Sequence, residues 1–132
     1  SDVYKRQVFI NAGHESILTF DENKNYEYIK SEMPPIGIVK YFTESMVKSN
    51  TINLKDKTFV VYTDGVTEGY MKNGEELGAE GVQKIINEMS QFTPKSIVEA
   101  IEKQLNWGAE KLRDDITCMA INIKNTELIK KK

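Results

Sequence analysis

The chain has 132 residues, enough for one domain or part of one, and its apolar content is sufficient for a core. No apolar run is long enough to span a bilayer, so we expect no membrane contact by this segment. The net charge is −2 with both signs scattered along the chain, which predicts no polyanion-binding surface and argues against a nucleic-acid partner. The single cysteine, Cys118, excludes a disulfide framework and indicates a reducing, cytoplasmic compartment.

The N-terminal part predicts a short hairpin. Residues 1–7 are polar, and we interpret them as a leader or a truncation scar, because they show no signal-peptide pattern. Residues 8–10 predict a strand that enters a glycine-centred turn and returns over 17–20. The only histidine, His14, lies in this turn, where both a hydrogen-bonding role and a catalytic role remain open.

The next stretch predicts extended structure joined by irregular connections. Residues 26–30 predict a strand with a polar face. The segment Pro34-Pro35-Ile36-Gly37 excludes a helix and predicts a turning connector. Residues 42–50 are ambiguous, whereas the alternation over 51–54 is typical of an edge strand.

A short apolar run that ends in an acid occupies the centre of the chain. The four residues Phe59-Val60-Val61-Tyr62 predict a strand buried on both faces. The pair Asp64-Gly65 then predicts a turn that releases the chain from the sheet. Asp64 is therefore expected at the end of a strand, where an ordinary turn and a functional site are both possible.

Two helices are predicted between this strand and the last one. Residues 80–89 carry apolar side chains at helical spacing on one face. Thr93-Pro94 predicts an N-cap followed by proline at the first helical position of a second helix. Strands followed by helices and a final strand predict an α+β fold, in which helices cover one face of a mainly antiparallel sheet.

A second group of acids precedes the last apolar run. Asp114 and Asp115 stand immediately before a strand predicted over residues 116–123. If this strand is an antiparallel neighbour of the central one, both acids approach Asp64 at one edge of the sheet. Converging carboxylates favour a cation, and oxygen ligands suit magnesium or manganese better than zinc. The alternative is that the acids are simply solvated residues at the start of a strand.

Five segments stand out along the chain, in this order: Asn11-Ala12-Gly13-His14, Pro35-Ile36-Gly37, Tyr62-Thr63-Asp64-Gly65-Val66-Thr67-Glu68, Asn73-Gly74 with Leu77-Gly78, and Asp114-Asp115-Ile116-Thr117. Together they resemble the PPM-type metal-dependent protein serine/threonine phosphatases, specifically their bacterial branch of SpoIIE and stress-response sigma-factor regulators. The resemblance implies a mainly antiparallel β-sandwich flanked by helices, of αββα type. We expect residues 8–124 to be the C-terminal portion of such a domain, incomplete at the N-terminus, and residues 125–132 to be a solvated basic tail.

The resemblance also implies a site and a reaction. It places metal ligands at Asp64 and Asp114, with Asp115 and Gly65 next to them. In the complete domain, two Mn²⁺ or Mg²⁺ ions would activate a water for attack on phosphoserine or phosphothreonine, without a phosphoenzyme. The implied substrate is a phosphorylated regulatory protein, typically an anti-sigma-factor antagonist, and a sensor domain can precede the catalytic one.

One departure from the family pattern limits these expectations. The chain has no counterpart of the metal-bridging Asp in a motif of Asp-x-x-Gly-His-Gly type, and His14 has no Asp ahead of it. We therefore expect weak metal binding and exposed sheet surface for the isolated chain. A haloacid-dehalogenase mechanism would need its nucleophile at position 62, which is a tyrosine. A catalytically silent interaction domain with a phosphatase-like fold remains an alternative.

Overall fold

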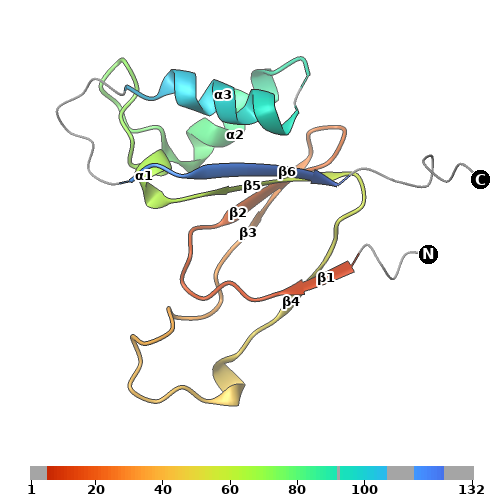
Figure 1. The fold of residues 1–132 in the computed structure, drawn as a ribbon, viewed down its shortest axis with the longest axis vertical. Helices are drawn as coiled ribbons and strands as arrows, with labels where there is room; N and C mark the ends of the chain where they lie inside the picture. Colours follow the sequence, from red (N-terminus) through yellow and green to blue (C-terminus); the bar gives the residue numbers. More distant parts are fainter. Residues whose placement is uncertain (1–5, 92, 107–114, 124–132) are drawn as a thin grey trace, which may run out of the picture.

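The computed structural model describes residues 6–91, 93–106 and 115–123 (Figure 1). These residues form an α+β architecture of antiparallel strands and few helices, as the sequence predicts. The elements are β1 (Arg6–Phe9), β2 (Ile17–Phe20), β3 (Tyr26–Ile29), the 3₁₀ turn η2 (Glu44–Met46), β4 (Asn50–Asn53), β5 (Lys57–Tyr62), α1 (Asp64–Thr67), α2 (Gly78–Glu88), α3 (Pro94–Gln104) and β6 (Cys118–Ile123).

The larger sheet has four antiparallel strands in the order β3-β2-β5-β6. The central strand β5 is bordered by β2 and β6, with Leu18 opposite Val60 and Tyr62 opposite Cys118. Most of its side chains are buried, which confirms the strand predicted from the apolar run. The sheet therefore brings the last strand of the chain next to the strand that leads to Asp64.

The helices α2 and α3 cover one face of this sheet (Figure 1). Residues directly opposite each other on neighbouring strands share a face, and Leu18, Val60 and Ala120 lie in one such row. The core forms between this face and the apolar stripes of the helices. Its fully buried helical side chains are Val82, Ile86, Ile97 and Ile101.

The start of α3 shows why local sequence predicted it well. Thr93 accepts a hydrogen bond from the Ser96 amide, and the Ser96 hydroxyl accepts one from the Thr93 amide, which completes a capping box. Pro94 occupies the first turn, where a missing N–H costs nothing. The predicted cap is confirmed. For α2 the predicted range of 80–89 is displaced by one or two residues from Gly78–Glu88.

The opposite face of the four-stranded sheet is also apolar. Phe59 lies opposite Ile121, and Val61 lies opposite Met119. Because side chains alternate between faces, these residues point away from the face that packs against the helices. Met119 is 50% exposed and Ile121 is 41% exposed. The chain thus presents apolar sheet surface, as expected from the sequence.

The predicted N-terminal hairpin is wrong. β1 begins at Arg6, two residues earlier than expected, and pairs with β4 in a separate two-stranded sheet, whereas β2 pairs with β3 and β5. The connection between β1 and β2 is not a tight turn. The backbone N–H of Gly13 donates to Ser31, and Ala12 forms a bridge with Met33. These longer-range contacts direct the chain from one sheet to the other.

The connector between β3 and β4 contains no regular element except η2, which resolves the ambiguous stretch over residues 42–50. It projects away from the four-stranded sheet (Figure 1). Its exposed apolar side chains include Ile36, Ile38 and Tyr41. None of the helices in the described part of the chain is both long and apolar enough to cross a membrane. Residues 1–5 and 124–132, which contain most of the predicted leader and all of the predicted tail, lie outside the described residues.

Candidate functional site

The candidate site lies at the sheet edge where β5 ends and β6 begins. The backbone N–H of Thr63 donates to the carbonyl of Thr117 at 3.0 Å, which extends the antiparallel pairing one step beyond Tyr62 and Cys118. The prediction that the two acid-bearing strands are antiparallel neighbours is confirmed. Asp64 and Asp115 consequently belong to the same edge of the sheet, whereas Asp114 lies outside the described residues.

Asp64 opens a short helix, not the simple turn predicted from Asp-Gly. Its carbonyl accepts hydrogen bonds from the Glu68 amide at 2.7 Å and from the Thr67 hydroxyl at 3.2 Å. Val66 is fully buried in the core and anchors the inner side of this turn. The chain therefore closes one helical turn, which leaves the Asp64 side chain exposed while its backbone is held.

The backbone around Gly65 is tightly packed. Gly65 is buried, and a Cβ atom added at Gly69 would approach the carbonyl oxygen of Gly65 within 2.9 Å. The Leu77 amide donates to the Gly69 carbonyl at 2.9 Å, and Asn106 donates to Tyr70 at 2.8 Å. Contacts from the start of α2 and the end of α3 thus fix the segment that follows Asp64.

The start of β2 reaches the same edge, because β2 runs antiparallel to β5 with Leu18 opposite Val60. His14 precedes it in the loop. The His14 amide donates to Asn11 Oδ1 at 2.9 Å, and its ring Nδ1 lies 3.2 Å from the Glu15 carbonyl. These contacts are those of a hydrogen-bonding turn residue, the first of the two roles left open by the sequence.

Glu15 is a residue near this edge that sequence reasoning did not single out. Burial, followed by the charges of Tyr28 and Glu15, raises the pKa of Tyr62 to about 12. Glu15 stands two residues before β2, which runs antiparallel to β5, and this position is the signal that could have identified it.

The donor atoms at this edge fit the implied metals in kind but not in number. Asp64 and Asp115 offer carboxylate oxygens, which suit Mg²⁺ and Mn²⁺. Within residues 6–91, 93–106 and 115–123, no three His, Cys, Asp or Glu side chains are grouped so that they could hold a metal ion. The described residues therefore provide part of a metal site at most.

Cys118 is a half-buried residue of β6. Its side chain faces the helices, and burial raises the pKa of its thiol to about 11. At neutral pH the thiol is protonated and unreactive, as expected for a small residue in a strand.

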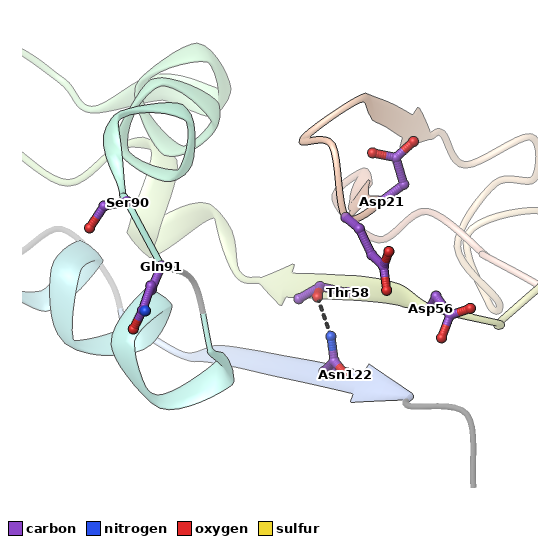
Figure 2. A pocket seen from close by; sticks show the side chains of 7 residues that line it. Asp21, Asp56, Thr58, Ser90, Gln91 and Asn122 are labelled. Carbon is purple, nitrogen blue, oxygen red and sulfur yellow. Dashed lines mark hydrogen bonds between the residues drawn. The ribbon is translucent and has the colours of Figure 1, made fainter. Parts of the chain in front are cut away.

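A separate pocket of about 320 Å³ lies toward the opposite end of β5, where Thr58 contributes to its lining (Figure 2). Asn122 donates to the Thr58 hydroxyl at 2.7 Å across the strands. The carboxylate of Asp21 already accepts hydrogen bonds from the Asn25 side chain and amide and from the Asn23 amide, which lower its pKa despite partial desolvation. None of the predicted site residues that the structure describes lines this pocket.

The model of the family "Stage II sporulation protein E (SpoIIE)" matches residues 2–124. The chain belongs to the SpoIIE family. This confirms the family inferred from the five sequence segments, and it makes the chain a homologue of PP2C-type phosphatase domains, a family of hydrolases. A comparison with curated proteins found no match.

Solved structures similar to this SpoIIE-family chain include three PP2C phosphatase domains. The SiaA PP2C domain of Pseudomonas aeruginosa has a TM-score of 0.69 at 18% identity, over 91% of this chain and 47% of that one. The PP2C domain of Bacillus subtilis SpoIIE with a fragment of its regulatory domain has a TM-score of 0.69 at 17% identity, over 89% and 34%. A manganese-presoaked SpoIIE phosphatase domain has a TM-score of 0.60 at 17% identity, over 91% and 56%.

These similarities show a shared fold. The antiparallel sheets and few helices of this SpoIIE-family chain match the PP2C phosphatase fold, which confirms the predicted fold class for a partial domain. The chain spans about half or less of the length of the SiaA and regulatory-fragment SpoIIE structures. Activity, substrate and partners of a complete protein are therefore matters for proposal.

Proposed function

We propose that this chain is part of a metal-dependent protein phosphatase that removes phosphate from phosphoserine or phosphothreonine of a regulatory protein, an anti-sigma-factor antagonist. The observation that supports the proposal most is that Asp64 and Asp115 belong to one sheet edge in a chain of the SpoIIE family. Asp64 and Asp114 are the proposed metal ligands. Asp115 and Gly65 are proposed to support them.

The residues at this edge would bind and orient the metal ions. The exposed carboxylate of Asp64 offers oxygen donors on a backbone that α1 holds in place. Gly65, the next residue, is buried, so the backbone that carries Asp64 is packed against the core. Bound Mn²⁺ or Mg²⁺ would supply an activated water and neutralise charge on the phosphoryl group. The manganese-presoaked relative supports this class of cofactor.

The proposed setting is cytoplasmic, in keeping with one unpaired cysteine and a phosphorylated protein as substrate. A sensor domain upstream would connect the phosphatase to a signal. The even mixture of charges supports a protein partner over a nucleic acid.

The experiment that tests the proposal compares manganese-dependent hydrolysis of a phosphate ester by this chain and by a longer polypeptide extended upstream in the same gene. We expect activity in the longer polypeptide only, because this chain lacks the bridging acid. Asp64→Asn should abolish turnover there. Asp56→Asn is the matched control, since Asp56 precedes β5 at its other end and has a positive φ of 54° that asparagine tolerates.

A silent interaction domain is the second candidate, favoured by the lack of a three-ligand group among the described residues. In that case Asp64→Asn would leave partner binding intact, and neither polypeptide would hydrolyse the ester. Activity in the longer polypeptide that survives Asp64→Asn would contradict the assignment of Asp64 as a ligand.

A further inference from the structure

Thr63 connects the two strands through its side chain. Its hydroxyl donates to the Asp115 carbonyl at 3.1 Å, and it accepts from the Thr117 amide at 3.1 Å. The Thr63 amide donates to the Thr117 carbonyl at 3.0 Å. Thr63 thus holds the chain at Asp115 and at Thr117, on both sides of Ile116.

The Thr63 hydroxyl acts as acceptor in place of the Thr63 carbonyl, because that carbonyl is hydrogen-bonded within α1. In a continued antiparallel ladder, the Thr117 amide would donate to the carbonyl of the residue opposite it. That carbonyl, on Thr63, instead accepts from the Val66 amide at 3.0 Å as α1 begins. The side-chain oxygen of Thr63 supplies the missing acceptor, so the chain leaves the sheet without losing its bond to Thr117.

This change of hydrogen-bond acceptor determines where Asp64 and Asp115 lie. Asp64 follows Thr63 directly, and Asp115 provides the carbonyl that the hydroxyl binds. Thr63 has extended backbone angles of −85° and 165°, which suit a β-branched residue. A serine can make the same bonds, whereas valine keeps the shape and loses the oxygen.

We propose that Thr63 is a positioning residue, whose hydroxyl keeps Asp64 and Asp115 in one register and thereby sets the affinity of the site for Mn²⁺. This rests on the proposed metal-binding role of Asp64.

The test measures metal binding without measuring activity. The ¹⁵N-labelled chain is titrated with Mn²⁺, and the concentration that half-broadens the amide signals of Asp64, Gly65 and Asp115 is recorded. We expect Thr63→Val to raise this concentration about three- to tenfold, the effect of losing one hydrogen bond. Thr63→Ser should stay within about twofold of the wild type. Exchange of the Thr117 amide with solvent should accelerate in Thr63→Val only.

Thr58→Val is the matched control. Thr58 also accepts a side-chain hydrogen bond across β5 and β6, from Asn122, but toward the other end of the strands. Its loss should destabilise the sheet without changing the Mn²⁺ midpoint. An equal rise of the midpoint in Thr58→Val and Thr63→Val would mean that general stability is responsible, and it would overturn the proposal.

The remaining outcomes separate this inference from the proposed function. A wild-type Mn²⁺ midpoint in Thr63→Val, together with loss of broadening in Asp64→Asn, would overturn the positioning role and leave the metal role of Asp64 standing. Unchanged exchange of the Thr117 amide in Thr63→Val would refute the hydrogen bond itself. If neither this chain nor the polypeptide extended upstream shows broadening near Asp64, both the metal role and the positioning role fail.

Discussion

Tyr62 lies directly opposite Cys118, and both side chains face α2 and α3 at the last pair of β5 and β6 before the edge of the sheet. The two ionisable groups therefore share one buried environment, a step away from Asp64. Burial is the largest cause of the raised pKa of each. The edge with the exposed carboxylates thus adjoins two buried groups, the Tyr62 hydroxyl and the Cys118 thiol, whose burial favours their neutral forms.

Stability should fall at alkaline pH. The pKa of Cys118 rises from 9.0 to about 11 on folding, and that of Tyr62 rises from 10.0 to about 12. Above pH 9 the unfolded chain releases these protons first, so the free energy of unfolding decreases as pH rises toward 12, whereas below pH 9 neither group contributes a slope. Urea unfolding from pH 8 to 11.5 measures this. Cys118→Ala should flatten the decrease between pH 9 and 11, and an identical profile in that variant would contradict the assignment.

Tyr62→Phe should stabilise the chain. The Tyr62 hydroxyl is buried and has no hydrogen-bond partner among the residues that the structure describes. Removing an unsatisfied buried group should raise the free energy of unfolding by about 1 kcal/mol. Tyr28→Phe is the matched control, because the Tyr28 hydroxyl donates to the Ala79 carbonyl at 3.3 Å and its loss should be destabilising. Urea titrations distinguish the two, and a destabilised Tyr62→Phe would point to a partner for this hydroxyl.

Gly13→Ala should be more destabilising than Gly74→Ala. Both glycines have positive φ, of 76° and 86°, so each alanine incurs a strain of about 1–2 kcal/mol. Only at Gly13 would the new Cβ meet another group, since it would lie 2.2 Å from Pro35 Cγ and 2.7 Å from the Pro35 nitrogen. At Gly74 nothing lies within 4 Å. Thermal unfolding of both variants checks the order, and equal losses would show that the connector moves aside.

The uncovered face of β6 should make the chain bind apolar dyes and self-associate. Met119 and Ile121 are 50% and 41% exposed on a face that they share with Phe59 and Val61. Met119→Gln combined with Ile121→Thr should lower 8-anilinonaphthalene-1-sulfonate fluorescence and the sedimentation coefficient at high concentration. The free energy of unfolding should change little, because both side chains are half exposed. Unchanged dye binding would indicate that the dye binds instead to the exposed connector around Tyr41.

Local sequence patterns predicted a helix or strand well where the signal lay within a few neighbouring residues. The apolar run before Thr63 predicted β5, and Thr93-Pro94 predicted the start of α3, because a buried strand and a capped helix each depend on neighbouring residues. The Asp64-Gly65 pair predicted a turn, whereas in the structure these residues begin the short helix α1. Burial of Val66 decided that outcome, and it is a tertiary contact.

The sequence by itself determined the family, the α+β class and the placement of acids at strand ends, since these follow from residue types and their order. Only the tertiary structure decided which strands pair: β1 joined β4 instead of β2, because register and partner depend on contacts far apart in the chain. It also decided that the Thr63 hydroxyl takes the place of a carbonyl. That exchange is invisible in sequence, because the need for it arises only where a helix begins at the edge of a paired strand.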